Sequence, residues 1–303
     1  MQIAVFGAGS LGSALGGLLA YEHEVVLVGR KEHMGAVRRS GLRIVDDIRR
    51  IVKLEAVMSL RGRGDVDLLI VTTKAYDTKS AIDECKRWTG RHTRVLTLQN
   101  GLGNLELIRS WRGQLGFGGT TTMGATLLSP GVVRLSGFGR TVIGSDMDVR
   151  EAGTIAKAFS SCGIPVSVTA NIGGEIWAKA AVNACINPTT AVLRVRNGRL
   201  LESDSVMRLV RAVSVECEQV ARAASVRLPC RPLFKKVVEV ATETSENVSS
   251  MLRDIELGRR TEIEQINGGF CRVGDEQGVP TPMNKALTSM VRALEASTAK
   301  EKG

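Results

Sequence analysis

The spacing of apolar residues along the chain changes near Pro165. Before it, short apolar runs at 2–6, 24–28, 66–73 and 94–98 are separated by polar turns or helical patterns, as in a buried parallel sheet. After it, apolar residues recur with the period of an α-helix and hardly return to strand spacing. Strands followed by helices predict an α/β fold, namely a doubly wound parallel sheet followed by an all-helical C-terminal domain. We place the domains at residues 1–168 and 169–303.

Finer elements follow from the same pattern. Residues 116–144 should supply the closing strands of the first domain, with a hairpin turn at Ser129-Pro130-Gly131. In the second domain we expect helices through residues 206–220, 233–257, 261–277 and 283–296, the second of them ended by Gly258.

A glycine-rich turn joins the first predicted strand to the first helix. It reads Gly7-Ala8-Gly9-Ser10-Leu11-Gly12, a G-x-G-x-x-G motif in the order strand, turn, helix. The first glycine allows the tight turn, the second lets the backbone approach a pyrophosphate, and the third allows close helix packing. The alternative is an ordinary strand-to-helix turn, but the position favours a dinucleotide-binding, Rossmann-type domain.

The second strand ends in Gly29-Arg30-Lys31, where an NAD-specific domain would carry an acidic residue for the ribose 2′-hydroxyl. Two cations suit a 2′-phosphate, which Arg30 can bind through two hydrogen bonds. We therefore expect NADP(H) as cofactor, the alternative being a solvated basic loop.

Two further residues follow predicted strands. Lys74 comes after the strand at 66–73, and Asn100 after the strand at 94–98. Ligands of doubly wound sheets lie beyond the carboxyl ends of the strands, so both residues should reach one crevice. Each could instead be an ordinary turn residue.

One helix of the C-terminal half carries polar groups on an apolar face. Lys179, Asn183 and Asn187 are spaced i, i+4 and i+8 among Ala, Val and Ile. Polar groups in such surroundings need partners, which favours a ligand site. The alternative is a surface helix whose lysine reaches solvent.

Composition narrows the function classes. The net charge is +10, but Lys and Arg are scattered among acidic residues, so no nucleic-acid partner is expected. The six cysteines include no C-x-x-C pair, which argues for reduced thiols and against a metal site. No apolar run is long enough for a bilayer, so we expect a cytoplasmic protein without a membrane partner. The apolar helix faces would suit a homodimer.

The chain resembles the ketopantoate reductase family (2-dehydropantoate 2-reductase) over essentially its whole length. The matching motifs are G-A-G-S-L-G, T-K-A, L-Q-N-G, G-T-T-T, W-x-K-x-x-x-N-x-x-I-N-P and N-V-S-S-M-L-R-D-I-E-x-G-R-x-T-E-I. The last two are the most specific. The resemblance implies NADPH-dependent reduction of 2-dehydropantoate to (R)-pantoate, on the route to pantothenate and coenzyme A.

The resemblance also implies roles for individual residues. Lys179 matches the proton-donating lysine of the family. The positions that match substrate contacts are Asn100, Asn183, Asn187, Asn197, Asn247 and Ser250. Those that match cofactor contacts are Gly7, Ala8, Gly9, Ser10, Leu11, Gly12, Arg30, Lys74, Asn100 and Ala125, with Glu262 lying between cofactor and substrate. From the sequence pattern alone, Glu264 would be as good a choice as Glu262.

The residue inventory is consistent with a lysine acid. The only histidines are His23, His33 and His92, all in the cofactor half and all expected in loops, and no Tyr-x-x-x-Lys pair occurs. Two alternatives stay open: a reductase of another small 2-oxo acid, and a non-catalytic NADP-binding regulator on the same fold. The regulator should lack the lysine or its amide partners, whereas this chain has them.

Overall fold

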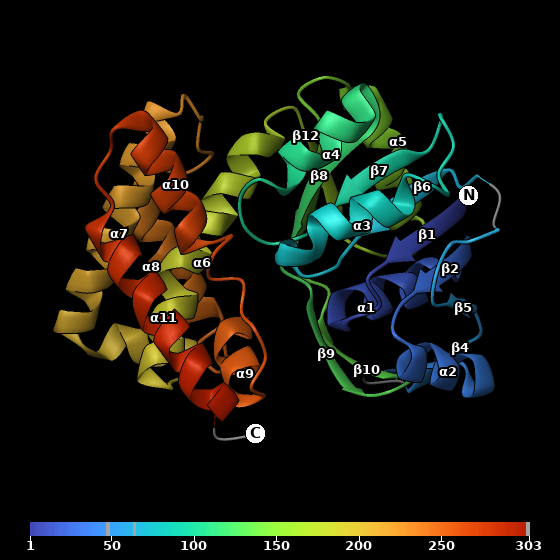
Figure 1. Cartoon of the computed structure of the whole chain (residues 1–303), viewed down its shortest axis with the longest axis horizontal. Coiled ribbons are helices and arrows are strands. Elements are labelled where there is room, and N and C mark those ends of the chain that lie inside the picture. Colours follow the sequence, from blue (N-terminus) through green and yellow to red (C-terminus); the bar gives the residue numbers. More distant parts are fainter. Residues whose placement is uncertain (47–48, 63–64, 301–303) are drawn as a thin grey trace. The chain divides into compact units, whose positions relative to one another are not determined.

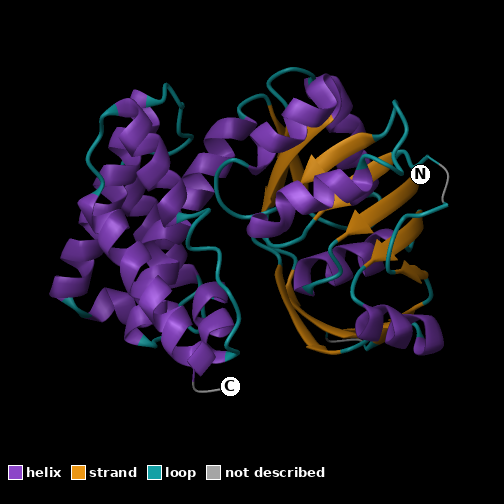
Figure 2. Cartoon of the chain, viewed as in Figure 1, coloured by secondary structure: helices purple, strands orange, loops and turns teal. Residues whose placement is uncertain are grey.

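The computed structural model describes residues 1–46, 49–62 and 65–300, and it divides into two compact units (Figure 1). Unit 1 comprises Met1–Gln99 and Asn104–Ile172, and unit 2 comprises Asn100–Gly103 and Gly173–Gly303. The described strands all belong to unit 1, whereas the described part of unit 2 is helical (Figure 2). The α/β fold with a helical C-terminal part is confirmed. The units divide after residue 172, compared with the domain boundary placed at 168 from the sequence.

The main sheet of unit 1 has eight strands among the described residues, in the order β12-β11-β8-β7-β6-β1-β2-β5. Neighbouring strands are parallel except β8 and β11, which are antiparallel. The strands are β1 (Gln2–Phe6), β2 (Glu24–Val28), β5 (Glu55–Val57), β6 (Leu68–Val71), β7 (Arg94–Thr97), β8 (Gly116–Thr121), β11 (Thr141–Gly144) and β12 (Val166–Thr169).

The strand order is that of a dinucleotide-binding sheet. If the strands from β1 to β8 in this sheet are numbered along the chain, their spatial order is 3-2-1-4-5-6. The order reverses between β1 and β6, which pair with Phe6 opposite Val71. Ligands of such sheets bind beyond the carboxyl ends of the strands at this reversal. The turns after Phe6 and Val71 therefore lie where a ligand of such a sheet binds, at the carboxyl ends of β1 and β6.

Helices cover both faces of this sheet. In β1, Ile3 and Val5 belong to one buried cluster and Ala4 and Phe6 to another, as the alternation of side chains along a strand requires. All four are less than a tenth exposed. The helices of unit 1 are α1 (Ser10–Leu19), α2 (Lys31–Ser40), α3 (Thr78–Cys85), α4 (Asn104–Arg112) and α5 (Val149–Ser160), with the 3-10 turns η1 (Ala75–Asp77) and η2 (Gly113–Leu115).

A second sheet packs against α1. Its order is β4-β3-β10-β9, formed by β3 (Leu42–Val45), β4 (Arg50–Val52), β9 (Gly124–Ser129) and β10 (Val132–Gly137). The hairpin predicted at Ser129-Pro130-Gly131 joins β9 to β10 as expected, but it pairs with β3 rather than closing the main sheet. A Cβ on Gly17 of α1 would lie 2.7 Å from Ile44 of β3, which shows how closely this sheet approaches α1.

Unit 2 is built around α6 (Ile172–Leu193), the longest helix of the described chain. Trp177 of α6 meets Phe270 of α10 edge to face, with ring centroids 5.5 Å apart. The other elements are η3 (Asn197–Glu202), α7 (Asp204–Ala223), α8 (Leu233–Glu243), α9 (Ser250–Glu256), α10 (Asn267–Gln277) and α11 (Pro282–Lys300).

Two helices of unit 2 differ from the prediction. The single helix expected at 233–257 is two helices, α8 and α9, separated by a loop. Residues of η3 stabilise that loop. The N–H of Gly198 donates to the Ser245 carbonyl, and the N–H of Asn197 donates to the Asn247 carbonyl. The helix expected from 261 begins only at Asn267. Among the described residues, no helix has the length and apolar character needed to cross a membrane.

Candidate active site

The turn after β1 has the geometry that the G-x-G-x-x-G motif requires. Gly7 has φ +112°, and the N–H groups of Gly7 and Ala8 both donate to the carbonyl of Val28. Thr72 Oγ1 donates to the Gly7 carbonyl at 3.0 Å, which ties the turn to the end of β6. A Cβ on Gly12 would lie 2.2 Å from the Gly7 carbonyl oxygen. The first and third glycines are therefore required by packing.

The start of α1 is suited to an anion. In the described part of the chain, no side chain caps this helix and its first turn has no acidic residue. The first N–H groups of an uncapped helix remain available to a ligand, and the helix dipole favours negative charge there. A Cβ on Gly9 would have no neighbour closer than 4.0 Å, so the absence of a side chain leaves open space beside these N–H groups. These residues fit the pyrophosphate of a dinucleotide.

Basic residues stand at the start of α2. Arg30 is the N-cap of this helix and Lys31 its first residue, and both side chains are exposed. His33, expected in a loop, lies instead inside α2 and is buried. Its Nδ1 accepts from the N–H of Gly131 at 2.8 Å, which leaves Nε2 to donate to Ser13 Oγ at 2.9 Å. Burial lowers the pKa of His33, consistent with a neutral ring that joins α2 to α1 and to the β9–β10 turn.

Lys74 and Ala125 lie near these turns in unit 1. Lys74 directly precedes η1 at the carboxyl end of β6. Ala125 lies in β9, where the N–H of Leu127 donates to Ser10 Oγ at 3.0 Å. Gln99 was not predicted as a site residue from the sequence. Its amide donates to Thr73 Oγ1, the Thr73 carbonyl and Thr78 Oγ1 at 2.8–3.1 Å. Its place in the L-Q-N-G motif, directly after a strand of the parallel sheet, is the sequence feature that could have predicted it.

Lys179, Asn183 and Asn187 lie along α6 as the spacing predicted. Lys179 and Asn183 are partly buried, and Asn187 is 7% exposed. Burial lowers the pKa of Lys179 to about 8, although the charge of Glu262 acts in the opposite direction. Loss of hydration disfavours the ammonium form, and a nearby carboxylate restores part of its stability. This lysine can therefore exchange a proton near neutral pH.

Glu262 lies in the segment between α9 and α10. It is 5% exposed, and one of its oxygens accepts from Asn100 Nδ2 at 3.2 Å. Glu264 instead pairs with Arg292 on α11 and is partly exposed. The two glutamates that the sequence pattern could not separate are thus distinguished by burial and by partner. Lys179, Glu262 and Asn100 form one electrostatic group in unit 2.

The remaining predicted substrate residues surround the loop between α8 and α9. Asn247 is exposed in this loop and Ser250 is the exposed first residue of α9, so the helix expected at 233–257 does not run through both. Asn197 is buried, and its Nδ2 donates to Thr244 Oγ1 at 2.9 Å. Ser249, which was not predicted as a site residue, caps α9 and accepts from Thr190 Oγ1 of α6 at 2.7 Å. The Thr190–Ser249 bond holds the start of α9 to α6, and the Asn197–Thr244 bond holds the end of α8 to η3.

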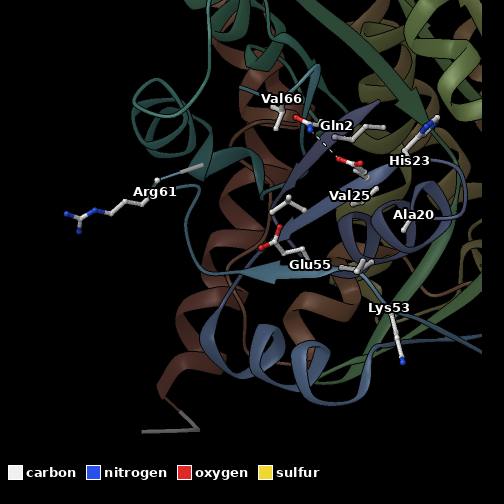
Figure 3. A pocket seen from close by; sticks show the side chains of 13 residues that line it. Gln2, Ala20, His23, Val25, Lys53, Glu55, Arg61 and Val66 are labelled. Atoms are coloured by element: carbon white, nitrogen blue, oxygen red, sulfur yellow. Dashed lines mark hydrogen bonds between the residues drawn. The ribbon is translucent and has the colours of Figure 1, made fainter. Parts of the chain in front are cut away.

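A separate cavity of about 820 Å³ lies at the opposite end of the strands of the main sheet, where β1 and β2 begin (Figure 3). Gln2 and Glu24, the first residues of β1 and β2, line it. In Figure 3 the side chains of Lys53 and Arg61 extend away from its centre. It contains none of the predicted site residues, and the glycine turn lies at the other end of these strands, so we do not assign the cofactor to it.

Comparison with known proteins agrees with this arrangement. Residues 3–147 match the family model "Ketopantoate reductase PanE/ApbA", and residues 171–295 match "Ketopantoate reductase PanE/ApbA C terminal". The chain is 38% identical to a 2-dehydropantoate 2-reductase of Pyrococcus horikoshii, over 98% of both chains.

Solved structures of the same fold are also similar. A PanE/ApbA family ketopantoate reductase from Ralstonia eutropha JMP134 has a TM-score of 0.92 at 33% identity, covering 98% of this chain and 99% of that one. A ternary structure of D-mandelate dehydrogenase with NADH and anilino(oxo)acetate has a TM-score of 0.93 at 30% identity, with the same coverage. With both family models matched in order and relatives aligned over nearly the full length, the chain belongs to the ketopantoate reductase family of oxidoreductases.

Proposed function

We propose that this protein reduces 2-dehydropantoate to (R)-pantoate with NADPH, in the route to pantothenate and coenzyme A. The observation that carries the proposal is the environment of Lys179. Burial lowers the pKa of its ammonium group to about 8, and the charge of Glu262 acts in the opposite direction. It stands on the same helix as Asn183 and Asn187. The name of the Pyrococcus horikoshii relative supports the choice of substrate.

Reduction of a ketone needs a hydride at the carbon and a proton at the oxygen. A bound nicotinamide supplies the hydride. Lys179 gives its proton to the 2-oxo oxygen, and its positive charge stabilises the negative charge that develops there. Glu262 keeps enough of the lysine protonated for this role, and Asn100 holds the Glu262 carboxylate.

The substrate is held by polar side chains of unit 2. The Ser250 hydroxyl, exposed at the start of α9, binds the carboxylate, while Asn183 and Asn187 orient the other polar groups. Asn247 lines the same site. Asn197 contributes through the loop that it holds by its bond to Thr244. Glu262 also binds either the substrate hydroxyl or the nicotinamide ribose.

The cofactor is NADP(H), bound by residues 7–12 with Arg30, Lys74, Asn100 and Ala125. Because the similar D-mandelate dehydrogenase was solved with NADH, the preference for the 2′-phosphate must be tested on this chain. Arg30→Ala should raise the KM for NADPH roughly tenfold or more, since a hydrogen bond to a charged group contributes about 1.5–3 kcal/mol. The KM for NADH should change less than about twofold, because NADH has no 2′-phosphate.

The control for this measurement is Arg61→Ala. Arg61 is an exposed arginine of the same unit beside the cavity at the opposite end of the strands, so its loss should leave both KM values unchanged. Equal changes for NADPH and NADH in Arg30→Ala would show that Arg30 does not meet the 2′-phosphate.

The rate of reduction should depend on the protonation of Lys179. Its ammonium form is the active one, so kcat should be constant below the pKa of about 8 and should fall as pH rises through it. Glu262→Gln removes the charge that raises this pKa, so the descending limb should move to lower pH. The measurement is kcat against pH with both substrates saturating.

Glu264→Gln is the matched control, because Glu264 lies two residues away but pairs with Arg292 on α11. Its pH profile should follow that of the wild type. An unshifted limb in Glu262→Gln would separate Glu262 from the titration of the lysine.

A second candidate is reduction of another 2-oxo acid, for which the similarity to D-mandelate dehydrogenase is the specific observation. NADPH and NADH oxidation with a panel of 2-oxo acids tests both candidates. We expect the highest kcat/KM for 2-dehydropantoate with NADPH. A higher value for a phenyl-substituted 2-oxo acid would favour the second candidate, and no turnover with any member would favour a non-catalytic NADP-binding protein.

A further inference from the structure

A proline interrupts the hydrogen bonding of α6 between its predicted substrate residues. Pro188 lies inside this helix and has no N–H, so it cannot donate to the carbonyl of Ala184 four residues earlier. Ala184 is fully buried. A buried carbonyl without a donor is costly, so another group must replace the missing N–H. Asn183 directly precedes Ala184, and Asn187 directly precedes Pro188.

Asn267, the first residue of α10, supplies the replacement. Its Nδ2 donates to the Ala184 carbonyl at 3.0 Å and to Asn284 Oδ1 at 3.0 Å. Both asparagines are fully buried. The interrupted turn of α6 is thus joined to α10 and α11 by one amide group.

Glu216 of α7 determines which way these amides face. It is 7% exposed and accepts from Met283 N–H, Asn284 N–H and Asn284 Nδ2 at 2.8–3.0 Å. An ionised carboxylate can only accept, so Asn284 must turn its NH₂ toward Glu216 and its oxygen toward Asn267. Asn267 must then present its own NH₂ to Asn284 and Ala184. We call the hydrogen bonds from Glu216 through Asn284 and Asn267 to the Ala184 carbonyl the relay. The direction of each of its bonds follows from the Glu216 carboxylate.

We propose that Asn267, oriented by Asn284 and Glu216, is a positioning residue for substrate recognition. It fixes the proline-interrupted turn of α6 and thereby the directions of Asn183 and Asn187 relative to Lys179. The inference rests on the proposed function, in which those three residues bind and protonate the 2-oxo acid. The residues that the relay positions, Asn183 and Asn187, are those assigned to the 2-oxo acid, and no member of it belongs to the dinucleotide turn, which lies in unit 1.

The test compares Asn267→Ala with Val291→Ala in the full-length protein. Val291 is a fully buried core residue of α11 with no part in the relay, so both changes leave a cavity in the same unit. Asn267→Ala should raise the KM for 2-dehydropantoate roughly ten- to hundredfold, as expected for displaced binding groups, and leave the Kd for NADPH within about twofold. Val291→Ala should change neither. Should Asn267→Ala not fold, Asn267→Leu keeps nearly the size of the side chain, removes the donor and should show the same KM increase.

A second arm uses Pro188→Ala, which supplies the N–H that Ala184 lacks. In that background Asn267→Ala should change the KM much less than in the wild type, because the Ala184 carbonyl then has a donor within α6. Equal changes in both backgrounds, or equal KM values for Asn267→Ala and Val291→Ala, would overturn the positioning role. Wild-type protein that reduces another 2-oxo acid overturns only the proposed substrate, and the same ratios are then measured with that acid. Wild-type protein that reduces no 2-oxo acid overturns both proposals.

Discussion

Lys179→Ala should lower kcat for 2-dehydropantoate reduction by about 10²–10⁴, equivalent to roughly 3–5 kcal/mol in the activation barrier. The change removes both the proton donor and the positive charge that faces the developing alkoxide. The described part of unit 2 contains no histidine to replace it, since His23, His33 and His92 all belong to unit 1. The measurement is kcat with NADPH saturating, alongside a thermal melt of the variant.

The stability of this variant is part of the test. Glu262 is 5% exposed, and removing Lys179 takes away the cation that acts on it, so the melting temperature should fall. Lys179→Arg keeps a positive charge, but the pKa of a guanidinium lies far above that of an ammonium group, which prevents proton release. It should therefore recover most of the lost stability without recovering kcat. A folded Lys179→Ala variant with more than about a tenth of wild-type kcat would exclude Lys179 as the required acid.

The parts of the fold that sequence predicted are those with local signals. The strand, glycine turn and helix at the N-terminus follow from short-range periodicity and from Gly7 and Gly12, whose Cβ atoms the turn cannot accommodate. The hairpin at Ser129-Pro130-Gly131 was also predicted from its turn residues. Its pairing partner β3 was not, because strand pairing across distant segments leaves no local signal.

The break between α8 and α9 shows the same limit. Residues Thr244, Ser245, Glu246 and Asn247 include neither glycine nor proline, so the periodicity continues through them. The helix ends there because backbone carbonyls of the loop accept from residues of η3. A tertiary contact overrides the local preference. His33 was misplaced for a related reason, since its partners Ser13 and Gly131 are distant in sequence.

The residues of the candidate site also differ in whether a local sequence pattern predicts them. The spacing of Lys179, Asn183 and Asn187 is a helical property and could be read directly. The preference for Glu262 over Glu264 came only from family resemblance, because both lie in similar surroundings along the chain. Burial of Glu262 and the exposed pairing of Glu264 with Arg292 separate them in the structure.

The glycines of the dinucleotide turn should respond differently to replacement by alanine. Gly7 has φ +112°, and a Cβ there would lie 2.5 Å from the backbone nitrogen of Thr73. Strain and overpacking of this kind cost about 2–5 kcal/mol together. The free energy of unfolding of Gly7→Ala, measured by urea denaturation, should therefore fall by about this amount. Gly12→Ala should behave similarly, because its Cβ would meet the Gly7 carbonyl oxygen at 2.2 Å.

Gly9→Ala should instead keep the fold and lose the cofactor. Gly9 has φ −83°, which alanine adopts without strain, and its Cβ would meet nothing closer than the Gly7 carbonyl oxygen at 4.0 Å. Its unfolding free energy should therefore change by no more than about 0.5 kcal/mol. The new methyl group would occupy the space beside the N–H groups of α1 where the pyrophosphate must approach, so the Kd for NADPH should rise about tenfold or more, equivalent to about 1.4 kcal/mol. Calorimetric titration with NADPH and a urea melt of the same variant measure the two quantities. Unchanged NADPH affinity in Gly9→Ala would place the pyrophosphate elsewhere, whereas lost affinity with an intact fold would assign this glycine to ligand approach and its two neighbours in the motif to packing.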